Sequence, residues 1–113
     1  MYIFINSDLK MSSGKIASQA CHAVQLVVEE VIRGAYEKYP VSKRYLDYMK
    51  WKNNCVKIVL KANEEQMREL IKHEDARYII DDGLTQVKED SLTAIAFFPN
   101  STICDVAKDY KLL

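Results

Sequence analysis

Cysteine, glycine and proline are scarce in this chain of 113 residues, which holds three cysteines, three glycines and two prolines. The cysteines are odd in number and widely spaced, and no C-x-x-C pair occurs. This pattern argues against a disulfide scaffold, and two histidines offer little for a structural zinc site. Because reduced thiols are typical of the cytoplasm, we expect a cytoplasmic protein.

Long apolar runs are also missing, and no stretch approaches the length of a membrane span. The opening residues 1–6 are too short and carry too little basic charge for a signal peptide, and they instead predict a strand. Hydrophobic residues make up 49% of the chain. Its length suits one domain, residues 1–113, with a single core.

Net charge is absent as well, since 16 basic and 16 acidic residues cancel at pH 7. This balance argues at first against a nucleic-acid partner. The charges are unevenly placed, however, with ten basic and five acidic residues in 1–61 and six basic and eleven acidic residues in 62–113. A basic face is one interpretation, and for most of the lysines we favour scattered, solvated positions. The residues concerned are Lys10, Lys15, Lys43, Arg44, Lys50, Lys52 and Lys57.

Apolar periodicity predicts four strands and four helices along the chain. We expect strands at 2–6, 55–61, 78–80 and 92–98, and helices at 14–33, 42–50, 64–73 and from Ser101 to near Tyr110. Gly34 is placed to end the first helix. The order predicts an α/β fold: one layered domain with a mixed sheet of about four strands and helices on both faces.

A polar turn runs into the first helix within Asp8–Ala23. Ser12 or Ser13 is placed to cap this helix, and Gly14 lets the backbone approach a ligand. The free N–H groups and the helix dipole attract anions, and Lys15 adds a positive charge. The full P-loop pattern is absent, so nucleotide hydrolysis is not predicted. A solvated lysine remains the ordinary alternative for Lys15.

Three polar side chains of this helix, Lys15, Gln19 and His22, recur at spacings of four and three residues. We expect them along one stripe, roughly opposite the apolar face. That apolar face comprises Ile16, Ala20, Val24, Val27, Val31 and Ile32. For His22 the ordinary alternative is a surface histidine bonded to a neighbour. Cys21 and His22 form no nucleophile–base pair, because adjacent helix positions point in different directions.

A second polar cluster, residues 81–86, follows a short apolar strand. Asp81 ends that strand, and open α/β sheets bind ligands near such strand ends. A plain polar turn is the ordinary alternative. Because Asp81 supplies a carboxylate and Thr85 a hydroxyl, the two polar clusters together suggest one hydrolytic active site.

Both clusters resemble the signatures of the type 2 peptidyl-tRNA hydrolases. Residues 8–11 and 14–23 resemble the first signature, and residues 81–87 are similar to the second, which usually reads Asp-Ala-Gly-Arg-Thr-Gln. The resemblance continues at 56–62 with the family's central strand, at 91–96 with its last strand, and at 110–113 with its ending. It therefore covers nearly the whole chain in order.

This resemblance implies hydrolysis of the ester that joins a peptide to tRNA, without a metal or organic cofactor. It implies that Asp81 orients or deprotonates water, that Lys15 stabilises the oxyanion, and that Thr85 bonds the water or the substrate carbonyl. The implied substrate-binding residues are Lys10, Ser13, Gly14, Gln19, His22, Gly83 and Gln86. By the same analogy, the chain is a cytoplasmic homodimer that acts on peptidyl-tRNA away from membranes.

Three positions depart from the family pattern. Ser13 and Leu84 stand where a lysine and an arginine are usual, and Asp82 replaces a small neutral residue. Each change weakens attraction to phosphate, so we expect weak tRNA binding. The alternative function is a family-like module that binds tRNA or protein with little or no hydrolysis.

Overall fold

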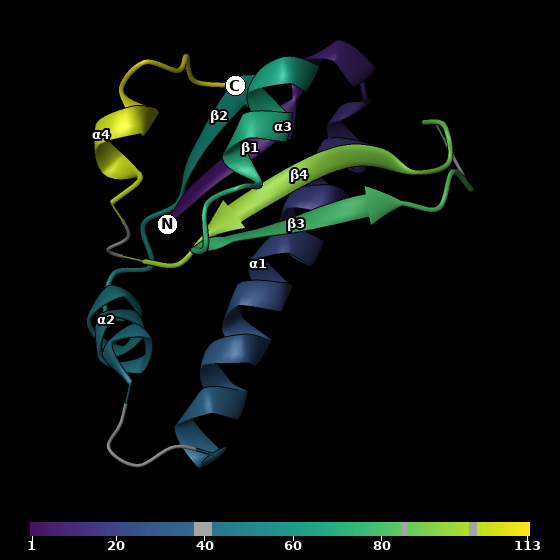
Figure 1. The fold of residues 1–113 in the computed structure, drawn as a ribbon. Helices are drawn as coiled ribbons and strands as arrows, with labels where there is room; N and C mark the ends of the chain where they lie inside the picture. Colours follow the sequence, from purple (N-terminus) through teal and green to yellow (C-terminus); the bar gives the residue numbers. More distant parts are fainter. Residues whose placement is uncertain (38–41, 85, 100–101) are drawn as a thin grey trace.

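The computed structural model describes residues 1–37, 42–84, 86–99 and 102–113. Its four strands form one mixed sheet in the order β2-β1-β4-β3 (Figure 1). The strands are β1 (Tyr2–Asn6), β2 (Ile58–Ala62), β3 (Ala76–Asp81) and β4 (Ser91–Phe97). β2 runs parallel to β1, while β4 is antiparallel to both β1 and β3. The predicted α/β fold with a mixed sheet is confirmed.

Helices cover both faces of this sheet. They are α1 (Ser13–Glu37), α2 (Lys43–Trp51), α3 (Glu64–Leu70) and α4 (Cys104–Ala107), and a 3-10 turn, η1 (Ser7–Leu9), precedes α1. In Figure 1, α1 passes behind the β3–β4 pair and α3 lies in front. One buried cluster includes Val27 and Ala94 on the α1 side, and another includes Met67 and Ile95 on the α3 side. The sheet therefore has a core on each face.

Several predicted element boundaries are wrong. α3 ends at Leu70 instead of residue 73, β3 begins at Ala76 instead of residue 78, and α4 ends at Ala107 instead of near Tyr110. α1 continues past Gly34 to Glu37, since one glycine within a helix costs only about 1 kcal/mol. β2 begins at Ile58, three residues later than predicted. The left-handed backbone of Cys55, with φ 52°, closes the turn after α2 instead. Ser101, the predicted cap of the last helix, lies outside the described residues.

The most deeply buried side chains of α1 lie in one row, and Ile16, Ala20 and Val24 pack, partly buried, against the same core. The row recurs every four residues and consists of Lys15, Gln19, Ala23, Val27 and Val31. Its last three members are buried, whereas Ile32, predicted to be apolar-facing, is 48% exposed. Lys15 and Gln19 therefore extend the buried row, and the predicted polar stripe opposite the apolar face is wrong. Of its members, only His22 is classed as exposed.

A bulge in β4 changes what this strand presents to α1. Ile79 pairs with Ala94, but Ile80 pairs with Leu92, so Thr93 is an extra residue. Ala94 belongs to the α1-side cluster, and Thr93 also contacts α1 through a hydrogen bond. A bulge re-aims side chains in this way. Here it turns a hydroxyl toward α1.

A charged cluster ties α1 to β3 and α2. Glu30 of α1 accepts two hydrogen bonds from Arg77, one of them from Nη2 at 2.6 Å, and Arg44 Nη1 lies 3.7 Å from the same carboxylate. Both guanidinium groups stack on the Phe98 ring, with centroid distances of 4.2 Å for Arg44 and 4.9 Å for Arg77. The hydrogen bond from Arg77 lowers the pKa of Glu30 below its ordinary value.

We expect Glu30→Gln to lower the free energy of unfolding at pH 7 by at most about 1 kcal/mol, since the carboxylate is partly exposed. Because the folded-state pKa is lowered, this stabilisation is present above the unfolded pKa and is lost as the pH falls through the folded one. Urea unfolding from pH 7 to pH 3 should show the two proteins converging at low pH. The neighbouring Glu29→Gln is the control, and a constant difference at every pH would contradict the assignment.

Candidate active site

The turn between β1 and α1 is held by two polar side chains. Asn6 is buried, its Oδ1 accepts from the Asp8 N–H at 3.1 Å, and its Nδ2 donates to the Leu92 carbonyl at 2.8 Å. Asp8 Oδ2 accepts from the Glu64 N–H at the start of α3, at 2.8 Å. These bonds fix where the chain leaves the sheet, and the exposed Lys10 follows in a left-handed conformation with φ 49°.

Ser12 caps α1, as one of the two predicted alternatives. Its Oγ accepts from the Lys15 N–H at 3.3 Å, and its own N–H donates to Gln86 Oε1 at 2.9 Å. Gln86 therefore ties the second polar cluster to the first turn of α1. Ser13 and Gly14 are exposed, and a Cβ on Gly14 would meet nothing within 4 Å. The surface of this turn is open.

Lys15 and Asp81 meet, although they are far apart in the sequence. Lys15 Nζ lies 2.7 Å from Asp81 Oδ2, and their side chains are 12% and 13% exposed. Lys15 comes from the first turn of α1 and Asp81 from the last position of β3. Such a shielded pair interacts more strongly than one in bulk water. The two predicted clusters thus share one place at the edge of the sheet.

A buried hydrogen bond lies next to this pair. Thr93 Oγ1 donates to Gln19 Oε1 and lies 3.4 Å from the carbonyl oxygen of Ile79. Thr93 is fully buried and Gln19 is 4% exposed. Gln19 follows Lys15 by one helical turn, and Ile79 precedes Asp81 by two residues. Thr93 of β4 therefore links α1, which carries Lys15, to β3, which carries Asp81.

Sequence reasoning missed Thr93. The available signal was a lone hydroxyl in the otherwise apolar run of residues 92–98. His22, by contrast, is exposed, with its Nε2 3.4 Å from Ser18 Oγ. It lies on the same helix as Lys15, two turns further on.

The loop after β3 makes a tight turn at Gly83. Its φ is 77°, and an added Cβ would lie 2.4 Å from the Glu89 backbone nitrogen, so only glycine fits. Leu84 is 88% exposed. Thr85, the predicted catalytic hydroxyl, lies outside the described residues.

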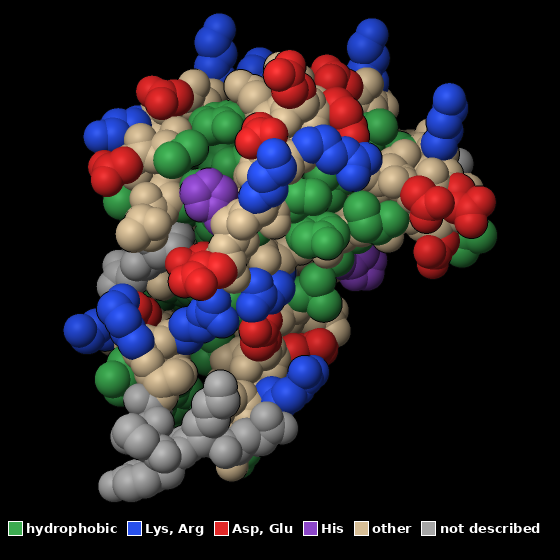
Figure 2. All heavy atoms as spheres, in the orientation of Figure 1, with side chains coloured by type: hydrophobic (Ala, Val, Ile, Leu, Met, Phe, Trp, Pro, Cys, Tyr) green, Lys and Arg blue, Asp and Glu red, His purple; other side chains and the backbone are tan. Residues whose placement is uncertain are grey.

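Acidic side chains dominate the surface of this loop. Asp82, Glu89 and Asp90 are all exposed, and Figure 2 shows acidic side chains gathered at the tip of the β3–β4 pair. The surface beside Lys15 and Asp81 therefore offers little attraction to phosphate.

The ion pair joins two kinds of group that can act in ester hydrolysis. A carboxylate can accept a proton from water, and an ammonium group can stabilise an oxyanion. Across the described ranges, no three His, Cys, Asp or Glu side chains are grouped to hold a metal ion. In the same ranges, no helix combines the length and apolar character needed to cross a membrane.

Comparison with known proteins gives a consistent picture. The family model described as "Peptidyl-tRNA hydrolase PTH2" matches residues 1–113. A protein named peptidyl-tRNA hydrolase from Methanococcus maripaludis is 37% identical, over 98% of this chain and 96% of its own length. One of the same name from Staphylothermus marinus is 31% identical, over 98% and 92%. A probable peptidyl-tRNA hydrolase 2 from Dictyostelium discoideum is 29% identical, over 97% of this chain and 52% of its own length.

Gln19→Leu and Thr93→Val should each lower the free energy of unfolding by about 1–3 kcal/mol, because each leaves a buried polar group without its partner. The double variant should lose much less than the sum, since an apolar pair leaves no unsatisfied group. Urea unfolding of all four proteins measures the coupling. If the double variant loses as much free energy of unfolding as the two single variants together, the hydrogen bond between Gln19 and Thr93 is contradicted.

Proposed function

The chain belongs to the peptidyl-tRNA hydrolase PTH2 family, and we propose that it hydrolyses the ester bond between tRNA and a peptide or N-blocked amino acid. The observation that carries this proposal is the Lys15–Asp81 pair, at 2.7 Å and at the edge of the sheet. The alternative of a binding module without hydrolysis is not favoured, because relatives matched over nearly their full length are named as hydrolases.

In the proposed mechanism, Asp81 takes a proton from a water molecule, whose oxygen attacks the ester carbonyl carbon. The carbonyl oxygen gains negative charge, which the ammonium of Lys15 stabilises. The tetrahedral intermediate then collapses, and the ribose oxygen of tRNA leaves with the proton that Asp81 returns. We assign to Thr85 a hydrogen bond to the water or to the substrate carbonyl. The products are the free peptide and tRNA.

The remaining site residues divide into two proposed groups. Lys10, Ser13, Gly14 and His22 are exposed around α1, and we propose that they contact the substrate. We propose that a second group supports the site through its own contacts, which are a buried hydrogen bond, a tight turn and a contact to the first turn of α1. This group consists of Gln19, Gly83 and Gln86.

Asp81→Asn should lower kcat for N-acetyl-aminoacyl-tRNA by about 10²–10⁴-fold, because the amide keeps the size of the carboxylate but cannot act as a base. Asp82→Asn is the matched control and should change kcat little, since its exposed side chain lies beyond the pair. Release of the N-blocked amino acid measures both. Equal losses at the two positions, or unchanged turnover in Asp81→Asn, would contradict the assignment.

We further propose a cytoplasmic homodimer in which residues 1–113 form one domain. Translation in the cytoplasm supplies the substrate, and the described cysteines, Cys21, Cys55 and Cys104, are free thiols. The dimer proposal rests on an apolar groove of about 480 Å³ between α1 and β2, lined by residues including Ala17, Ala20, Val24, Val28 and Val59. Exposed apolar grooves of this kind are typical of protein interfaces.

Ala17→Glu should shift the proposed dimer toward monomer, because it places a charge in the apolar groove. Ala17 is exposed in the single chain, so the fold should persist. Sedimentation measures the change, with Ile80→Glu on the other sheet face as the control. A monomeric parent protein, or equal dimerisation of both variants, would refute this interface.

A further inference from the structure

A run of positive charge in this chain lies away from the proposed active site. Residues 42–57 contain five basic residues and one acidic residue, whereas residues 81–90 contain four acidic residues and one basic residue. Figure 2 shows Lys and Arg side chains around α2, at the lower left, and acidic ones at the opposite tip. A polyanionic substrate therefore meets its main electrostatic attraction outside the site.

Three lysines around Trp51 form what we call the basic patch: Lys50, Lys52 and Lys57. None of them takes part in an ion pair with any described residue, whereas Lys43 is paired with Asp47. Lys57 Nζ lies 5.1 Å from the centroid of the Trp51 ring, and Trp51 Nε1 donates to the Val56 carbonyl at 2.7 Å. The indole is thus fixed, and the lysines present positive charge to a ligand, with Lys57 also bordering the apolar groove proposed as the dimer interface.

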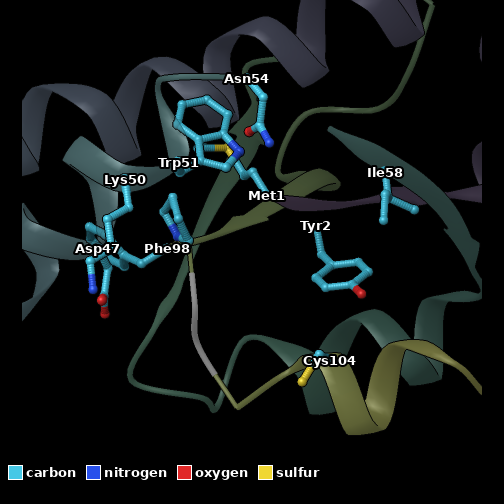
Figure 3. A pocket seen from close by; sticks show the side chains of 10 residues that line it. Met1, Tyr2, Asp47, Lys50, Trp51, Asn54, Ile58, Phe98 and Cys104 are labelled. Atoms are coloured by element: carbon cyan, nitrogen blue, oxygen red, sulfur yellow. The ribbon is translucent and has the colours of Figure 1, made fainter. Parts of the chain in front are cut away.

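The basic patch borders a cavity of about 510 Å³ (Figure 3). Lys50 and Trp51 line this cavity with Met1 and Tyr2. The amino group of Met1 donates to the Val56 carbonyl at 2.8 Å, which places the patch at the N-terminal end of β1. The turn that leads to Lys15 begins at the other end of this strand. Five residues of β1 span roughly 17 Å, so no single nucleotide reaches both places.

We propose that the basic patch binds backbone phosphates of the tRNA body while the 3′ end lies at Lys15 and Asp81. This inference rests on the proposed function, which supplies an RNA long enough to reach both ends of the sheet. Lysines act on phosphate as point charges and read no sequence, and double-stranded RNA is recognised mainly through its shape and backbone. The patch supplies the affinity that the acidic loop around Asp82 lacks.

The test replaces all three lysines, as Lys50→Gln, Lys52→Gln and Lys57→Gln together, and compares two substrates. One is full-length N-acetyl-aminoacyl-tRNA, and the other is the same ester on a short single-stranded CCA oligonucleotide. For the tRNA we expect KM to rise about tenfold, kcat to stay unchanged, and the salt slope to fall by roughly three units. The kinetics on the oligonucleotide should be unchanged.

The matched control is the double variant Lys72→Gln and Lys108→Gln, which removes ion-paired lysines from the α3 and α4 regions. An equal effect on both substrates, or an equal effect of patch and control variants, would overturn the inference. If the parent protein hydrolyses neither substrate, the proposed function fails by itself. Anisotropy titration with tRNA that carries no amino acid then tests whether the basic patch binds RNA. Weaker binding by the triple variant supports the inference, and equal binding overturns it.

Discussion

The packing of α1 on the sheet requires one helical row to match what the strands present. Toward the end of the helix this row is apolar, with Val27 and Val31 in the core. Toward its start, the same row contains Gln19 and then Lys15. Gln19 accepts a hydrogen bond from Thr93 of β4, and Lys15 pairs with Asp81 of β3. The ion pair is therefore an extension of the core packing. The geometry of the ion pair is set by the same contacts that pack α1 against the sheet.

The architecture is largely readable from the sequence because its elements are local. A short β-branched strand at Tyr2–Asn6 and the Asn63 capping box of α3 are determined by neighbouring residues. The errors arise where a local signal is weak. Gly34 is typical of a helix end, yet a glycine within a helix costs only about 1 kcal/mol, and α1 continues through it.

The site is less predictable than the fold, because its supports depend on register. The resemblance brought Lys15 and Asp81 to one expected site, and the structure places them in contact. The resemblance gave Gln19 and His22 the same expected role, although Gln19 is buried and His22 is exposed. The hydrogen-bond partner of Gln19, Thr93, is the extra residue in β4, and a strand pattern alone does not reveal a bulge.

Zero net charge is a poor guide to the partner of this protein. What matters to an RNA is the potential at the surface that it meets, within about 10 Å at ordinary salt. Here five positive charges in residues 42–57 and the acidic loop around Asp82 lie at opposite ends of the sheet and cancel only in the total. Such a separation orients a polyanion: its body is drawn toward α2 and repelled from the loop. Only the short 3′ end of the RNA then needs to enter beside Lys15 and Asp81. There the Lys15 ammonium is paired with the Asp81 carboxylate, which the proposed reaction uses.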